Sequence, residues 1–464
     1  MILIWLKLIF AILIIWPRGY VLVYVIDRSK SFSFGFKCFA GWLFGLAAFT
    51  LDLFAVNVNF GVKFAPWLFI ALALGQIIGL QFVIFLFERK ILLPDFKKFP
   101  PFFKKQWLDF SGWPKGQKLA WAGLVLFLTF KILMSVWQAA NIPTYDFDGW
   151  NNWNLRAKVI FEEKTIPLDK TSPFYLGGGL KSYPLNDGLF KVWLAYAAGR
   201  FDDSFVNQAS VFYYLLLLLI FYFSLPKRLN RLWRLLALYA LSSLPFLYFH
   251  SQAPYADLLF SAFLFLAVGC IFHFLDGRGN SFFYISGIAL AFAVWTKNEG
   301  LAVVFPVLAV ETLIFLLLKW RNVFNLFIYW FFAVLTALPW VSFKIMNKID
   351  ILSGDSSSFN FVFNQAYLGE MFSSVFLRSH FNLLWLLVFF IIIFQLRLIK
   401  KDKALGYLAL NLALFFGLYN GIILFTDKAY DTTALARVNM QLAPLGVLFL
   451  TFFFERFFGK MKLK

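Results

Sequence analysis

Two carboxylates, Asp146 and Asp148, lie two residues apart where a strongly apolar segment ends and a long polar loop begins. A carboxylate is ionised at neutral pH and can act as a general base on a hydroxyl group. Two carboxylates at this spacing can also bind a divalent cation such as Mg²⁺ or Mn²⁺. The alternative is an interfacial belt, in which Trp150 and Trp153 lie at the lipid headgroups and the carboxylates are solvated. Because charged groups are costly at a water–lipid boundary, we expect a functional site with Asp148 and Asp146 as candidate catalytic residues.

The same loop carries a second polar group near its return to the apolar part of the chain. Lys181 and Tyr183 precede Pro184 there, and an ammonium and a phenol could together contact a phosphate or a sugar. The alternative is a helix start, with Pro184 in the first turn and Tyr183 in the aromatic belt. The sequence leaves both interpretations open.

Three further polar positions interrupt apolar segments later in the chain. Asp257 either caps the following helix or forms part of a site. Lys297 and Glu299 split a stretch of otherwise apolar residues, which is either a helical hairpin with a solvated turn or a place where the lysine binds an anion. Arg437 opens the last apolar segment, and either binds phosphate or extends to the lipid headgroups.

These residues belong to a chain with the composition of a membrane protein. Of the 464 residues, 61% are hydrophobic and 14% are charged, and apolar runs of about 20 residues recur. We therefore predict an all-α integral membrane protein, because only helices satisfy their own backbone groups in lipid at such lengths. The runs indicate about thirteen transmembrane spans, near residues 2–26, 38–60, 66–87, 118–138, 205–224, 232–249, 256–275, 282–296, 300–318, 325–345, 381–397, 404–425 and 438–455.

Basic residues predict the orientation of these spans. The net charge is +19, and Lys and Arg gather in joins that all fall on one side if the spans alternate. An excess of Lys and Arg is typical of cytoplasmic loops, so the charge reports topology and requires no nucleic-acid partner. The loop 139–204 then lies on the external face, with short interfacial helices expected over 151–163 and 185–200 and a break at Gly177–Gly179.

Cysteine and histidine usage adds little chemistry. The two cysteines and three histidines are scattered, which predicts neither a disulfide framework nor a zinc-type metal site. We expect one integral membrane domain, in which residues 1–117 form an accessory part with a basic cytoplasmic loop and residues 118–464 form the main module.

In order along the chain, these motifs resemble the GT-C superfamily of polytopic glycosyltransferases, which includes aminoarabinose transferases and protein O-mannosyltransferases. The resemblance covers roughly residues 118–455. It rests on short motifs: Asp146-Phe147-Asp148-Gly149-Trp150, Tyr183-Pro184-Leu185, Tyr255-Ala256-Asp257, Thr296-Lys297-Asn298-Glu299-Gly300, and Arg437 with Gln441 and Pro444. The chain departs from the best-known members by three extra N-terminal spans and by lacking a large C-terminal external domain.

The resemblance implies an enzyme that transfers a sugar from a polyprenyl-phosphate donor to a hydroxyl of a lipid, glycan or protein on the external face of the membrane. We expect that membrane to be a bacterial inner membrane, with the active site on the periplasmic side. An aspartate of the loop, Asp148 or else Asp146, would be the base, and the sugar would be transferred with inversion. Some members need a divalent cation and others do not. Groups implied to bind substrate or the departing lipid phosphate are Arg156, Lys158, Lys181, Tyr183, Asp257, Lys297, Glu299 and Arg437.

Three other classes of protein remain as alternatives. A lipid or sugar transporter or flippase predicts paired charges within spans and inverted repeats, and no repeat is visible. An O-antigen-type ligase or polymerase would use arginines of an external loop, whereas this loop leads with aspartates. A non-catalytic scaffold predicts that the carboxylates tolerate replacement.

Overall fold

The chain folds into a bundle of helices, as predicted. The computed structural model describes residues 2–27, 30–89, 110–317, 323–350, 362–426 and 432–461, and these ranges contain no strand. Its first half comprises α1 (Ile2–Ile14), α2 (Trp16–Ile26), α3 (Phe34–Phe60), α4 (Pro66–Glu88), α6 (Lys115–Asn141), α7 (Asn154–Glu163), α8 (Asn186–Ala198), α9 (Asp203–Val206) and α10 (Gln208–Ser224). Its second half comprises α11 (Arg231–Ser242), α12 (Pro245–Phe249), α13 (Asp257–Leu275), α14 (Asn280–Val294), α15 (Phe305–Leu317), α16 (Val323–Asn347), α17 (Tyr367–Phe372), α18 (Leu384–Phe394), α19 (Leu396–Lys400), α20 (Lys403–Leu424) and α21 (Thr432–Met461).

Eight helical segments of the described residues are long and apolar enough to cross a membrane. They are Ile2–Ile26, Phe34–Phe60, Lys115–Asn141, Asp203–Ser224, Asp257–Leu275, Val323–Asn347, Lys403–Leu424 and Ala434–Phe458. Four shorter apolar helices, Pro66–Gly79, Asn280–Val294, Gly300–Leu313 and Leu384–Phe394, accompany them. A membrane protein is therefore supported, while the predicted count of about thirteen spans is not confirmed.

One predicted span, residues 232–249, is interrupted. Helix α11 ends at Ser242, and Leu244 adopts an extended conformation (φ −69°, ψ 117°) before Pro245 begins α12. A proline disfavours the helical conformation of the residue before it, so the helix cannot run on through Leu244. Two short helices replace the single continuous span that hydropathy indicates.

Glycines bring the N-terminal helices into close contact. A side chain on Gly19 of α2 would collide with the backbone of Gly41 and Gly45 in α3, and one on Gly45 would collide with the carbonyl oxygen of Ile15. Small residues at such positions allow two helix backbones to approach closely, as is common in membranes. Next to this crossing, Arg18 pairs with Asp52 of α3 at 2.7 Å, so paired charges do occur within predicted spans.

The segment from 142 to 202 contains the short helices predicted for it. A π-helical turn, Gly149–Trp153, leads into α7, and the chain then turns through Gly177–Gly179, whose φ angles of 89°, 84° and 60° favour glycine. Helix α8 follows, at the position predicted for the second short helix. Nearly all its residues are buried, and it packs against α1, α3 and α7.

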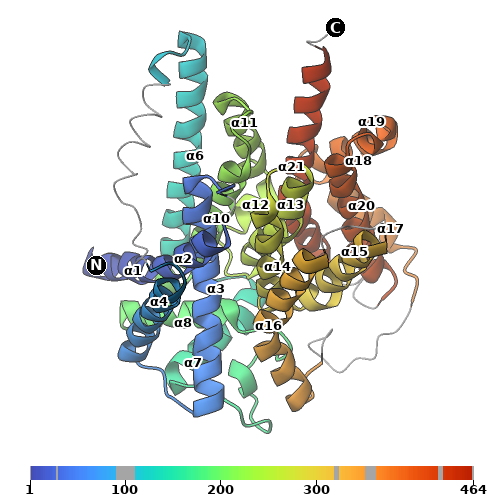
Figure 1. Ribbon diagram of the computed structural model, residues 1–464. Helices are drawn as coiled ribbons and strands as arrows, with labels where there is room; N and C mark the ends of the chain where they lie inside the picture. The colour runs from blue at the N-terminus through green and yellow to red at the C-terminus, as the bar shows by residue number, and fades with distance from the viewer. Residues whose placement is uncertain are drawn as a thin grey trace.

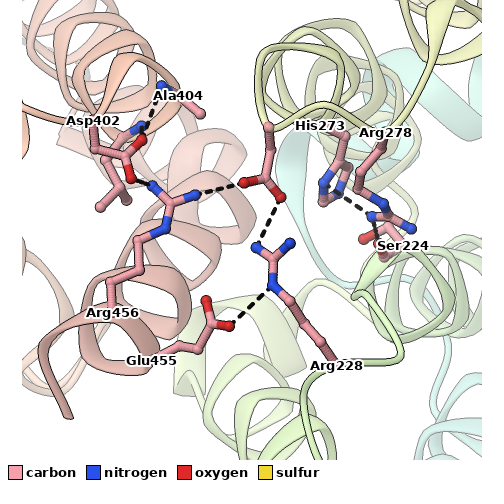
Figure 2. Close-up of polar contacts among 10 residues, drawn as sticks. Ser224, Arg228, His273, Arg278, Asp402, Ala404, Glu455 and Arg456 are labelled. Carbon is pink, nitrogen blue, oxygen red and sulfur yellow. Dashed lines mark hydrogen bonds and ion pairs between the residues drawn. The ribbon is translucent and has the colours of Figure 1, made fainter. Parts of the chain in front are cut away.

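A network of charged side chains joins the ends of α13, α20 and α21 to the segment between α10 and α11 (Figure 2). Asp276, which follows α13, accepts from Arg228 at 2.9 Å and from Arg456 of α21 at 2.6 Å. Arg228 also pairs with Glu455 at 3.0 Å, and Arg456 with Asp402 at the start of α20. The network therefore fixes one end of the bundle, on the side where α21 ends in Figure 1.

Candidate active site

At the other end of the bundle from this network, the start of α13 and the end of α14 meet at a buried group of charged side chains. Asp257 is the first residue of α13 and is fully buried. Lys297, directly after α14, places its Nζ 2.9 Å from Asp257 Oδ1 and 2.8 Å from Glu299 Oε1. Gln441 of α21 donates from Nε2 to the same Asp257 oxygen at 2.8 Å. The lysine thus holds two carboxylates together at the junction of three helices.

A second ion pair attaches the 142–153 segment to this group. Arg437, near the start of α21, donates from Nη1 to Asp148 Oδ2 at 2.6 Å. The guanidinium also lies 5.2 Å from the ring centre of Tyr255, two residues before Asp257. The Asp148 side chain is 33% exposed and that of Arg437 is 15% exposed, so the carboxylate is the partner nearer to solvent. Residues 289 positions apart in the sequence are therefore joined directly.

We define these five charged side chains, Asp148, Asp257, Lys297, Glu299 and Arg437, as the ion cluster. It lies at the end of the bundle opposite the network of Figure 2. Asp257 begins α13 and Asp276 follows its end, and at 1.5 Å per residue these positions are about 28 Å apart. Arg437 and Arg456 lie about the same distance apart along α21, again at 1.5 Å per residue. This separation matches the thickness of a bilayer core, about 30 Å.

Local electrostatics fix the protonation states at the edge of the ion cluster. Burial alone would lower the pKa of Lys297, but Asp257 and Glu299 outweigh it and the pKa lies above its ordinary value. The pKa of Tyr183, whose ring centre is 5.7 Å from Lys297 Nζ, is raised by burial and by Glu299. The site therefore presents a charged lysine and a protonated phenol at neutral pH.

His250 is a neutral member of the same surroundings. Burial lowers its pKa to about 4; nearby Asp257 has a smaller effect that raises the pKa, and Arg437 has a smaller effect that lowers it further. Its Nδ1 lies 3.1 Å from the carbonyl oxygen of Phe246, and a neutral ring that donates there keeps a lone pair on Nε2. His250 thus offers an acceptor and no charge.

Several polar atoms around the ion cluster are buried without a hydrogen-bond partner in the described part of the chain. They are Asp257 Oδ2, Glu299 Oε2, Gln441 Oε1, His250 Nε2, Tyr419 OH and Arg437 Nε. Buried polar groups are rarely left unpaired in native proteins, so such a concentration indicates a binding site. Most of these atoms are acceptors. A complementary ligand brings several hydrogen-bond donors, together with an anion for Arg437.

Asp146 lies beside the ion cluster, not within it. Burial and the neighbouring Asp148 both raise its pKa. Its charge also contributes to the surroundings of Tyr255. It borders a small cavity of about 40 Å³ with Thr144, Asn207 and Gln252.

Three predicted binding residues, Arg156, Lys158 and Lys181, are not members of the ion cluster. Arg156 is buried and donates to the carbonyl oxygens of Leu176, Tyr183 and Pro184, so its guanidinium shapes the loop. Lys158 is exposed on α7. Lys181 lies with its Nζ 5.9 Å from the ring centre of Tyr175. Three donors of the Arg156 guanidinium thus serve backbone oxygens, and its role in binding substrate or lipid phosphate stays a prediction.

Lys344 of α16 is a buried residue of this region that the sequence did not reveal. Its Nζ donates to the Ser182 carbonyl oxygen and to Asn298 Oδ1, both at 2.9 Å, and Asn298 donates to Ser182 Oγ at 3.0 Å. These bonds join the segment carrying Tyr183 to the one carrying Lys297. A lone lysine near the end of an apolar span is typical of one that extends to the headgroups, so no signal marked it.

The carboxylates of the ion cluster do not form a ligand set for a divalent cation. Each accepts from Lys297 or Arg437, which already supply the neutralising charge. Within the described ranges, no three His, Cys, Asp or Glu side chains are grouped as metal ligands would be.

An apolar groove runs along α21 beyond the ion cluster. It has a volume of about 410 Å³ and lies between α11, α18 and α21, where Leu236, Leu387 and Leu450 are among the lining residues. Its first α21 residue, Val447, is ten positions after Arg437, or about 15 Å along the helix at 1.5 Å per residue.

No protein-family model, curated protein or solved structure matches this chain. The case for its function therefore depends on the geometry of the ion cluster.

Proposed function

We propose that the protein is a membrane glycosyltransferase that moves a sugar from a polyprenyl-phosphate donor to an acceptor hydroxyl. The observation that carries the proposal is the ion cluster with its surrounding unpaired acceptors. A sugar brings several hydroxyl donors to Asp257, Glu299 and Gln441, and a phosphate complements Arg437. The motif order that resembles the GT-C superfamily agrees with this chemistry.

The apolar groove along α21 supports a donor linked to a lipid. A phosphate at Arg437 would leave a hydrocarbon chain within about 15 Å of Val447, at 1.5 Å per helical residue. An isoprenoid chain in this groove would replace lipid contacts of Leu236, Leu387 and Leu450 with its own. Water-soluble nucleotide sugars would have no use for such a surface.

The charges of the bundle support an external site. The end of the bundle that carries the network of Figure 2 includes Arg228, Arg456 and loops rich in Lys and Arg. Such loops are typical of the cytoplasmic side of a membrane protein. The ion cluster lies at the other end and would face the periplasm if the membrane is a bacterial inner membrane. In this proposal the 139–204 loop also lies outside, in a protein of about thirteen spans.

The proposed reaction is a single displacement. Asp148 takes the proton of the acceptor hydroxyl, and that oxygen forms a bond to the anomeric carbon. The bond from the anomeric carbon to the phosphate oxygen breaks with inversion, and its electron pair leaves with the lipid phosphate. Arg437 and Lys297 stabilise the charge that develops on the phosphate, while Tyr183 can donate its phenol proton in a hydrogen bond. No step of this scheme passes through a metal ion.

The test is cleavage of the donor by the purified protein in lipid nanodiscs. A panel of polyprenyl-phosphate hexoses and pentoses with radiolabelled sugars is mixed with an extract of membrane acceptors. Wild type should release sugar from at least one donor, and Arg437→Gln should lower the rate by about 10²–10³, the usual effect of removing one group that stabilises a transition state. Lys158→Gln, on the exposed face of α7, is the matched control. Movement of intact donor across the bilayer without cleavage would instead support the transporter.

A further inference from the structure

Arg437 carries an internal anion at the position where the proposed function requires a donor phosphate. Asp148 Oδ2 lies 2.6 Å from its Nη1, and Arg437 Nε is buried with no partner in the described residues. A carboxylate and a phosphate present similar oxygens to a guanidinium. The two anions therefore compete for the same binding position on the Arg437 guanidinium.

The charge balance of the ion cluster does not allow both anions to stay. Two cations, Lys297 and Arg437, face three carboxylates, so the cluster already has a formal charge of −1. A phosphate added to it without loss of a carboxylate would raise the negative charge further in a largely buried site. Uncompensated buried charge is strongly unfavourable, so one carboxylate must leave.

Asp148 is the carboxylate that can leave most easily. Asp257 is fully buried and is held by both Lys297 and Gln441. Glu299 is 19% exposed and is held by the same lysine, whereas the Asp148 side chain is 33% exposed. Asp148 also directly precedes the π-helical turn Gly149–Trp153, two residues after the non-helical stretch 142–146.

We propose that Asp148 is a placeholder for the donor phosphate on Arg437 and becomes available as the base only when the phosphodiester of the donor displaces it. This inference rests on the proposed function, because it assigns an order to that reaction. The donor binds first, Arg437 exchanges Asp148 for the phosphate, and the freed carboxylate then receives the acceptor hydroxyl. An acceptor that arrives before the donor meets a base still bound to Arg437.

The test is binding of a polyprenyl phosphate without sugar, measured on the full chain in nanodiscs by microscale thermophoresis. Asp148→Asn removes the competing anion, so the affinity for the lipid phosphate should rise about tenfold, equivalent to about 1.4 kcal/mol. Asp146→Asn removes a neighbouring charge outside the ion cluster and should change the affinity by no more than about twofold. Arg437→Gln should abolish binding in the wild-type and Asp148→Asn backgrounds.

Equal or weaker binding by Asp148→Asn would overturn the placeholder role, as would the same gain in Asp146→Asn. A thermal-shift measurement on each variant confirms that it is folded. The two proposals fail separately. If Asp148→Asn binds the lipid phosphate more tightly but no donor is cleaved, the competition between Asp148 and phosphate for Arg437 is supported and the transferase is rejected. Donor cleavage by wild type without tighter binding by Asp148→Asn would retain the transferase and reject the placeholder.

Discussion

Replacement of Lys297 by methionine tests the electrostatic basis of the ion cluster. Lys297 is 3% exposed and pairs with Asp257 at 2.9 Å and Glu299 at 2.8 Å. Methionine keeps the apolar stem and removes the charge, which leaves the buried Asp257 carboxylate without its ion-pair partner and with the Gln441 amide as a remaining hydrogen-bond donor. Removing one partner of a buried ion pair typically costs about 3–5 kcal/mol, and we expect a loss of this size in the free energy of unfolding.

A second variant separates charge from packing. In Lys297→Met/Asp257→Asn the uncompensated carboxylate is gone, and replacing a buried pair by neutral groups is often close to neutral in stability. We expect the double variant to recover at least about 2 kcal/mol relative to Lys297→Met, a coupling within the range found for contacting residues. Equilibrium unfolding in mixed micelles measures all four members of the cycle. Additive effects of the two substitutions would refute the reasoning, because they would mean that Lys297 and Asp257 do not interact.

Three further perturbations test other parts of the structure. Gly45→Leu should lower the yield of folded protein in size-exclusion chromatography, because its side chain would meet the backbone at Ile15; a normal yield would contradict the close crossing of α2 and α3. His250 should make stability depend on pH, since the unfolded chain binds a proton below about 6.5 and the folded chain only below about 4. Stability should therefore fall by up to about 3 kcal/mol as the pH drops through this window, and His250→Gln should remove that slope in thermal unfolding. Arg156→Gln should lower the melting temperature, because it breaks the hydrogen bonds of the guanidinium to three backbone oxygens. The folded variant should keep its affinity for lipid phosphate within about threefold. A large loss of affinity would instead support Arg156 as a phosphate ligand.

Much of the helical architecture could be predicted from hydropathy, because a membrane span needs a long apolar run. The helices α3, α6, α13 and α20 occupy predicted positions for this reason. The break between Ser242 and Pro245 was missed, although the proline was visible, because residues 232–249 are apolar throughout most of their length. The burial of α8 could not be predicted, since it depends on which helices cover it.

The members of the candidate site could be predicted where a charge interrupts an apolar segment. Asp257, Lys297 and Arg437 were recognised in this way, and the structure brings all three together. Their pairing could not be predicted, because it joins residues far apart in the sequence. Arg156 and Lys344 show the converse: composition does not tell whether a basic side chain faces backbone oxygens or a ligand.

The most direct test of the account is the rate of sugar transfer in a single turnover by wild type, Asp148→Asn and Asp146→Asn. A general base typically contributes 10²–10⁴ to the rate, so Asp148→Asn should lose about that factor at normal protein level. Asp146→Asn, outside the ion cluster, should lose less than about tenfold, below that range. Equal rates in all three proteins, or a larger loss in Asp146→Asn, would contradict the assignment of Asp148 as the base held by Arg437.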